Sequence, residues 1–183
     1  DRAAFLQGLL TNDTASLAPG RGCYAAWLTP QGRMLCDLHV FESGDMLMLD
    51  VPAAEADAAA ARFEQFHFSE DVQIAPLPSL RAVWIHGRAA PRALGRGYDG
   101  WVQYQNARVE FGGVPVVIAR VDQLAVPGFV IYADAQHEDE VTAALVDAGA
   151  LHATPESIAA ARVEAAYPIF GIDMTSETIP LEA

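Results

Sequence analysis

The chain has 183 residues, of which 52% are hydrophobic and 19% are charged, a balance typical of a globular protein and not of a disordered one. Eleven basic and 24 acidic residues give a formal net charge of −13, which excludes the cationic footprint of a nucleic-acid-binding protein. No stretch approaches the roughly 20 consecutive apolar residues of a membrane span. We therefore expect neither a nucleic acid nor a membrane as partner.

The first predicted element is a helix over 2–10, because apolar residues recur there at helical spacing. A β-hairpin follows, with its turn at Thr29-Pro30-Gln31-Gly32, where proline fixes φ and glycine suits the last position of the turn. If Thr29 and Gly32 close this turn, Tyr24 lies opposite Asp37 across the hairpin.

The alternation of side chains along a strand divides the second hairpin strand into two faces. The apolar face, which belongs to a core, carries Met34, Cys36, Leu38 and Val40. The other face carries Arg33, Leu35, Asp37 and His39. Aspartate is depleted inside strands, so the carboxylate of Asp37 requires an explanation.

Further elements follow from apolar runs, from proline at a helix start and from the glycine pair at 112–113 that favours a primed turn. Helices are predicted over 52–66, 91–94, 136–148 and 155–166. Strands are predicted over 46–51, 72–75, 82–86, 108–111, 114–121 and 129–133.

The order hairpin, strand, helix, strand occurs twice, over about 22–86 and 107–152, and indicates an internal pseudo-repeat of ferredoxin-like units in an α+β fold. We expect a first unit over about 1–86, a second over about 107–152, and a C-terminal helix and tail over 155–183. No glycine- or proline-rich linker separates the units, so we expect one compact body.

Two cysteines do not make a disulfide framework, and Cys23 and Cys36 lie diagonally in the predicted register, at the long limit for a disulfide. We expect two reduced, buried thiols in a cytosolic protein. The five histidines are scattered without ligand spacing, so no metal site is expected.

Three stretches occur in the order found in one known superfamily: 5–13 (FLQGLLTND), 28–38 (LTPQGRMLCDL) and 162–182, which holds RVEA, GID and IPLE. The chain thereby resembles the folate-binding domain shared by the glycine-cleavage aminomethyltransferase (T-protein) and the YgfZ-type proteins of iron–sulfur cluster assembly and repair. The resemblance implies a tetrahydrofolate pocket between the two pseudo-repeats, and a small C-terminal barrel domain that this sequence does not include.

The resemblance also implies site residues. In the aminomethyltransferase a pair of aspartates precedes a leucine in the hairpin strand; the second, the catalytic carboxylate that faces the reactive nitrogens of tetrahydrofolate, matches Asp37. The first is replaced by Cys36. Arg120 precedes Gly128 by the spacing of an arginine that holds the folate, and Arg162 matches the arginine of the family's helix. Both arginines are thus candidate folate contacts. Tyr24, which lies opposite Asp37 in the predicted hairpin, is a further candidate because its hydroxyl could hydrogen-bond the same ligand.

Each assignment has a structural alternative. Asp37 can pair with Arg33 or His39 on the wet face of the strand, and Tyr24 can be an ordinary half-buried tyrosine. Arg120 lies inside an apolar strand, where a charge must meet a ligand or an internal ion pair. The helix arginine fits a contact with the folate tail or a structural salt bridge equally well.

The family's pterin-binding glutamate falls on Val130, which cannot mimic a carboxylate. This departure favours the YgfZ branch, and hence a tetrahydrofolate-binding maturation or repair factor for iron–sulfur proteins. The alternatives are an aminomethyltransferase that moves a one-carbon unit to tetrahydrofolate, and a degenerate interaction module that binds no folate. The expected location is the cytoplasm, or the mitochondrial matrix in a eukaryote.

Overall fold

The computed structural model describes residues 1–180 and divides the chain into two compact units. The first unit is formed by Asp1–Pro78 together with the stretch that starts at Ile169, and the second unit is Ser79–Pro168. The predicted end of the IPLE motif, Leu181 and Glu182, lies outside the described residues. The mixed fold of helices and two antiparallel sheets agrees with the predicted α+β class.

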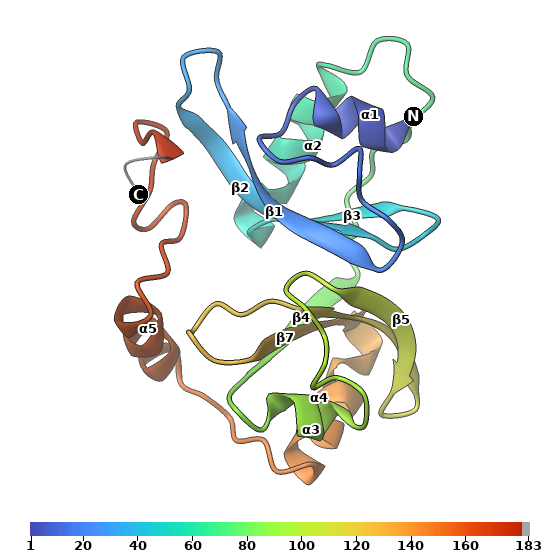
Figure 1. Ribbon diagram of the computed structural model, residues 1–183, viewed down its shortest axis with the longest axis vertical. Helices are drawn as coiled ribbons and strands as arrows, with labels where there is room; N and C mark the ends of the chain where they lie inside the picture. The colour runs from blue at the N-terminus through green and yellow to red at the C-terminus, as the bar shows by residue number, and fades with distance from the viewer. Residues whose placement is uncertain (181–183) are drawn as a thin grey trace. The chain divides into compact units, whose positions relative to one another are not determined.

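The first unit is a three-stranded antiparallel sheet in the order β1-β2-β3, with helices on one face (Figure 1). Its elements are α1 (Arg2–Gln7), β1 (Arg21–Leu28), β2 (Met34–Glu42), β3 (Leu47–Asp50), the 3-10 turn η1 (Ala53–Glu55) and α2 (Ala56–Glu64). The alternate strand residues Cys23, Ala25, Trp27, Cys36, Leu38 and Val40 form one core with α1 and α2. Trp27 stacks on Phe63 of α2 at a centroid distance of 4.3 Å.

The hairpin turn closes at the predicted residues, because the amide of Gly32 donates to the carbonyl of Thr29 at 2.9 Å. The φ of Gly32 is +82°, and the Thr29 amide bonds to the Arg33 carbonyl, so the turn adds one residue to the second strand. A second irregularity lies between Trp27 and Leu28. The predicted register is therefore wrong by two residues.

The observed partners are Tyr24 with His39 and Ala26 with Asp37, instead of Tyr24 with Asp37. A shift of two residues keeps every side chain on its face, so the predicted faces of β2 hold from Cys36 onward. Before that point the irregularity reverses them: Met34 packs with Ala26, and Leu35 packs against the α1/α2 core.

The second unit is a four-stranded antiparallel sheet in the order β4-β7-β6-β5 (Figure 1). Its elements are β4 (Leu80–His86), α3 (Ala90–Leu94), β5 (Asn106–Phe111), β6 (Val114–Arg120), β7 (Gly128–Asp134), the 3-10 turn η2 (Ala135–His137), α4 (Glu138–Asp147) and α5 (Pro155–Glu164). Helices α3 and α4 bury Ala90, Leu94, Val141 and Leu145 against strand residues that include Ile118, Phe129 and Ile131.

The structure does not confirm the pseudo-repeat, because β4, expected to complete the first unit, pairs with β7 over its whole length. No strand forms over 72–75; Val72 and Ile74 instead pack against the first core from a loop, and Pro76 and Pro78, which lack amide donors, follow them. The first helix ends at Gln7, three residues earlier than predicted.

None of the helices in the described residues is long and apolar enough to cross a membrane. Within the same residues, no group of three or more His, Cys, Asp or Glu side chains lies close enough to hold a metal ion.

Cys23 and Cys36 are both buried and free, as predicted. Cys36 pairs with Trp27, four residues along β1 from Cys23, a separation of roughly 13 Å at the rise of a β-strand. That exceeds the reach of a disulfide. Burial raises the pKa of both thiols, and that of Cys36 rises from 9.0 to about 11.

We predict that alkaline pH destabilises the fold through Cys36. The native thiol keeps its proton until its pKa of about 11, whereas the unfolded thiol loses it near 9.0, so stability present below pH 9 is lost as pH rises through 11. Urea titrations should show a loss of roughly 2 kcal/mol over this range, and a clearly smaller loss in Cys36→Ala. Equal losses in the two proteins would contradict the assignment.

Candidate functional site

Asp37, in the middle of β2, is held by the phenol of Tyr24, which donates a hydrogen bond to Asp37 Oδ2 at 2.9 Å. The two residues are diagonal neighbours, since Tyr24 is paired with His39 and Asp37 with Ala26. Diagonal neighbours lie within reach of aromatic side chains, and the methyl group of Ala26 leaves room for the ring. A phenol that donates to a carboxylate forms a strong, charge-assisted bond.

Both basic neighbours of Asp37 hold other carboxylates. Arg33 pairs with Glu177 at 3.0 Å, and His39 Nδ1 lies 3.3 Å from Asp50 Oδ2. The ion pair with Arg33 or His39 that was the structural alternative for Asp37 is not among the contacts given for the described residues. The hydrogen bond from Tyr24 takes its place.

Next to Asp37, the face carries an apolar cluster formed by Ala26, Met34 and Met174, with Leu28 and Phe170 packed against it. Met174 reaches the sheet from the segment that starts at Ile169, and the Met34 amide donates to the carbonyl of Thr178 at 3.0 Å. The carboxylate is thus flanked by a phenol and by apolar side chains, an environment in which a flat heterocycle can be both packed and hydrogen-bonded.

His39 and Asp50 extend this polar group, and sequence analysis did not single them out as a pair. The His39 ring lies between two aromatic rings, with centroids 5.8 Å from Tyr24 and 6.0 Å from Phe41. Asp50 faces His39 directly across β2 and β3. Correct pairing of the third strand would have revealed the contact.

Arg120, in the second unit, forms an internal ion pair. Its Nη2 lies 2.9 Å from Asp122 Oδ2, its Nε donates to both oxygens of that carboxylate at 3.2 Å, and its Nη1 donates to the carbonyl of Trp101. Asp122 Oδ1 also accepts the amide of Gly128 at 2.8 Å. The ion pair thus closes the loop between β6 and β7.

Sequence analysis did not identify Asp122 as the partner of Arg120, although only one residue separates the two in the chain and Asp122 begins the loop that follows β6. The carboxylate was therefore visible in the sequence. Asp37 and Tyr24 belong to the first unit and Arg120 to the second, and each pair is described within its own unit.

Arg162 lies in the last turn of α5, where its Nη1 donates to the carbonyl of Tyr167 at 2.9 Å. This bond ties the guanidinium to the chain that leaves the helix. Contact with a folate tail stays a prediction for Arg162, and a role in holding the folate stays one for Arg120.

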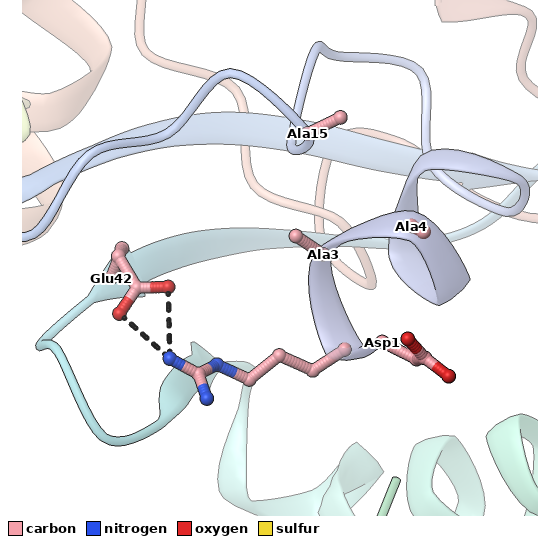
Figure 2. A pocket seen from close by; sticks show the side chains of 6 residues that line it. Asp1, Ala3, Ala4, Ala15 and Glu42 are labelled. Carbon is pink, nitrogen blue, oxygen red and sulfur yellow. Dashed lines mark hydrogen bonds and ion pairs between the residues drawn. The ribbon is translucent and has the colours of Figure 1, made fainter. Parts of the chain in front are cut away.

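Each unit also holds a pocket. In the first unit a shallow cavity of about 410 Å³ is lined by the start of α1, Ala15 and Glu42. One nitrogen of the Arg2 guanidinium donates to both oxygens of the Glu42 carboxylate, at 3.2 and 3.4 Å. Figure 2 shows this contact among the residues that line the cavity. In the second unit, an apolar groove of about 740 Å³ runs along β4 and α4. Asp37 is not among the described residues that line these two pockets.

His86 lines the groove of the second unit and stacks on Trp84, with centroids 5.6 Å apart and an interplanar angle of 8°. Burial lowers the pKa of His86, and the nearby carboxylate of Asp122 opposes this effect. The imidazole also lies against the backbone of Gly128, where a Cβ would come within 2.7 Å of His86 Nδ1.

We predict that Gly128→Ala destabilises the protein by about 1–3 kcal/mol. The new methyl would lie 2.3 Å from the carbonyl oxygen of Val121, a backbone atom that cannot turn away. Thermal or urea denaturation measures the loss. Gly100→Ala is the matched control, because nothing lies within 4 Å of its Cβ position; an equal loss in both variants would overturn the steric argument.

Comparison with known proteins agrees with this description. The family model described as GCVT N-terminal domain matches residues 1–183. A protein of Geobacillus kaustophilus named aminomethyltransferase is 30% identical over 193 residues, which cover 98% of this chain and 52% of that protein. A Bordetella petrii protein of the same name is 32% identical, over 100% of this chain and 52% of its own length. The chain thus spans about half the length of these relatives.

One solved structure, the glycine cleavage system aminomethyltransferase T from Bartonella henselae, matches with a TM-score of 0.80 and 23% sequence identity. The match covers 97% of this chain and 50% of that one, and it shows the fold. None of the three relatives named here is a YgfZ-type protein, so the branch that the sequence favoured is not confirmed.

Proposed function

The chain belongs to the family of GCVT N-terminal domains, and we propose that it binds a tetrahydrofolate and provides Asp37 for the transfer of a one-carbon unit to that folate. In this step the carbon of a carrier-bound aminomethyl group bonds to the folate, while its nitrogen leaves as ammonia and the carrier sulfur leaves as a thiol. The names of its relatives support the alternative that sequence analysis placed second, and they replace the iron–sulfur reading as the leading proposal. The observation that carries the proposal is the hydrogen bond between Tyr24 and Asp37.

The proposed role of Asp37 follows from its geometry. Tyr24 donates to Oδ2 and so restrains the orientation of the carboxylate. The other oxygen, Oδ1, is the atom that we propose faces a folate nitrogen. There a carboxylate accepts or returns a proton as the nitrogen bonds to the incoming carbon, and it stabilises positive charge that develops on the nitrogen.

Asp37 supplies the carboxylate that the proposed folate site needs, whereas the position of the family's pterin-binding glutamate is taken by Val130. Val130 is fully buried in β7, where it is paired with Trp84 on one side and Ala119 on the other. It offers no carboxylate for the pterin. The proposal therefore assigns to this chain Asp37, Tyr24 and the apolar cluster around Met174 as the contacts, with Arg120 and Arg162 as further candidates.

Val130 is also the observation that favours a second candidate, the YgfZ-type function with iron–sulfur clients as partners. The proposed folate contact at Asp37 is the same in both candidates, but only the aminomethyltransferase releases methylene-tetrahydrofolate from a loaded lipoyl carrier protein. For either one we propose the cytoplasm, where two free, buried cysteines are usual.

We predict that Asp37→Asn weakens tetrahydrofolate binding at least about tenfold, because a neutral amide replaces the charge at unchanged size. Titration calorimetry with tetrahydrofolate measures the affinity, and production of methylene-tetrahydrofolate from the lipoyl carrier measures turnover. The control is Asp99→Asn, which removes an exposed carboxylate in the second unit.

Three results are distinguishable. If the unmodified protein binds tetrahydrofolate and produces methylene-tetrahydrofolate, and Asp37→Asn loses both activities, the leading proposal is supported. Binding without turnover supports the second candidate. If the unmodified protein binds no tetrahydrofolate, both proposals fail and the chain is an interaction module with a folate-binding fold.

A further inference from the structure

The outer edge of β1 is covered by the segment 10–12, which is not itself a strand. Leu10 forms an isolated antiparallel bridge with Trp27. The amide of Thr11 donates to the carbonyl of Ala26 at 3.0 Å, and the amide of Ala26 donates to Thr11 Oγ1 at 2.9 Å. A side-chain hydroxyl thus replaces the backbone acceptor that a neighbouring strand would supply.

These bonds show to which type of cross-strand pair Ala26 and Asp37 belong. The amide and carbonyl of Ala26 both point to the outer edge, so they are not available to β2, and the pair Ala26–Asp37 is of the type that lacks mutual hydrogen bonds. In this type the two strands approach to about 4.5 Å between Cα atoms, and the side chains lie closer together. This close approach brings the phenol of Tyr24 within reach of Asp37.

Asn12 continues the same edge by one residue. Its Nδ2 donates to the carbonyl of Tyr24 at 2.8 Å, while its Oδ1 accepts the amide of Asp13 at 2.8 Å. The second bond determines which end of the amide faces Tyr24, because only the nitrogen can donate to a carbonyl. The side chain of Asn12 is therefore fixed at both ends, and it holds the backbone of the residue whose phenol holds Asp37.

We propose that Asn12 is a positioning residue for the Asp37 site. It acts through Tyr24: by anchoring the carbonyl of Tyr24 at the edge of β1, it sets where the phenol oxygen lies relative to Asp37 Oδ2. The effect on ligand affinity rests on the proposed folate function, whereas the effect on the Tyr24 ring does not.

The test uses a change of one atom. Asn12→Asp keeps the oxygen that accepts from Asp13 and replaces the donor to Tyr24 with an oxygen that repels its carbonyl. Asp13→Asn is the matched control, because it keeps the oxygen that accepts the amide of Ser16. We expect Asn12→Asp to weaken tetrahydrofolate binding about fivefold, the value of one ordinary hydrogen bond, and Asp13→Asn to leave the affinity unchanged.

A double-mutant cycle with Tyr24→Phe separates positioning from a general loss of stability. If Asn12 acts through the phenol, Asn12→Asp costs no further affinity once the hydroxyl is gone. If the two losses multiply, Asn12 acts by another route and the proposal is overturned.

A second measurement needs no ligand. In protein labelled with 3-fluorotyrosine, the fluorine resonance of Tyr24 is identified by its disappearance in Tyr24→Phe. We expect Asn12→Asp to shift or broaden that resonance and to leave those of the other tyrosines in place. An unchanged Tyr24 resonance refutes the positioning role even when folate binds. If the protein binds no folate but the Tyr24 resonance shifts in Asn12→Asp, the positioning role of Asn12 is supported and the proposed folate function is refuted.

Discussion

The candidate site depends on the hydrogen bond between Tyr24 and Asp37. A carboxylate in the middle of a mostly buried strand loses hydration, and it needs a donor to offset that loss. Tyr24 supplies it at 2.9 Å, across the diagonal of a strand pair. The bond in turn requires the observed register of β1 and β2, and that register is set by the turn at Gly32 and by the irregularity at Trp27.

The register explains why part of a wrong prediction is still useful. Each irregularity adds one residue to the second strand, and two additions restore the alternation that one would reverse. Cys36, Leu38 and Val40 therefore fill the core as expected, while Met34 and Leu35 exchange faces. The alternation of apolar residues in the sequence predicts which face of a strand is buried. It does not predict where a bulge inserts an extra residue, because a single inserted residue has no periodic pattern.

Non-local pairing is the other feature that the sequence could not provide. The residue pattern of Leu80–His86 correctly predicts a strand, β4. Nothing in that pattern shows that its partner is β7 and not a strand of the first unit. The tail shows the same limit: the side chain of Met174 packs beside residues of β1 and β2, although it follows them by more than a hundred positions. By contrast, Asp37 was proposed from the resemblance and Tyr24 from its predicted place opposite Asp37 in the hairpin, and the hydrogen bond between them is present although the register differs; their part in folate binding stays a prediction.

The charge partners of Asp37 and Arg120 differ, and the difference bears on the proposed reaction. The Arg120 guanidinium forms an ion pair with the Asp122 carboxylate, which also accepts the amide of Gly128. The charge of Arg120 is therefore neutralised within the loop that this pair closes. The partner of Asp37, in contrast, is a neutral phenol, which orients the carboxylate without neutralising it. A carboxylate oriented by a neutral donor can accept from a protonated nitrogen or stabilise positive charge that develops on it. For this reason Asp37, and not Arg120, is the residue on which the proposed reaction depends.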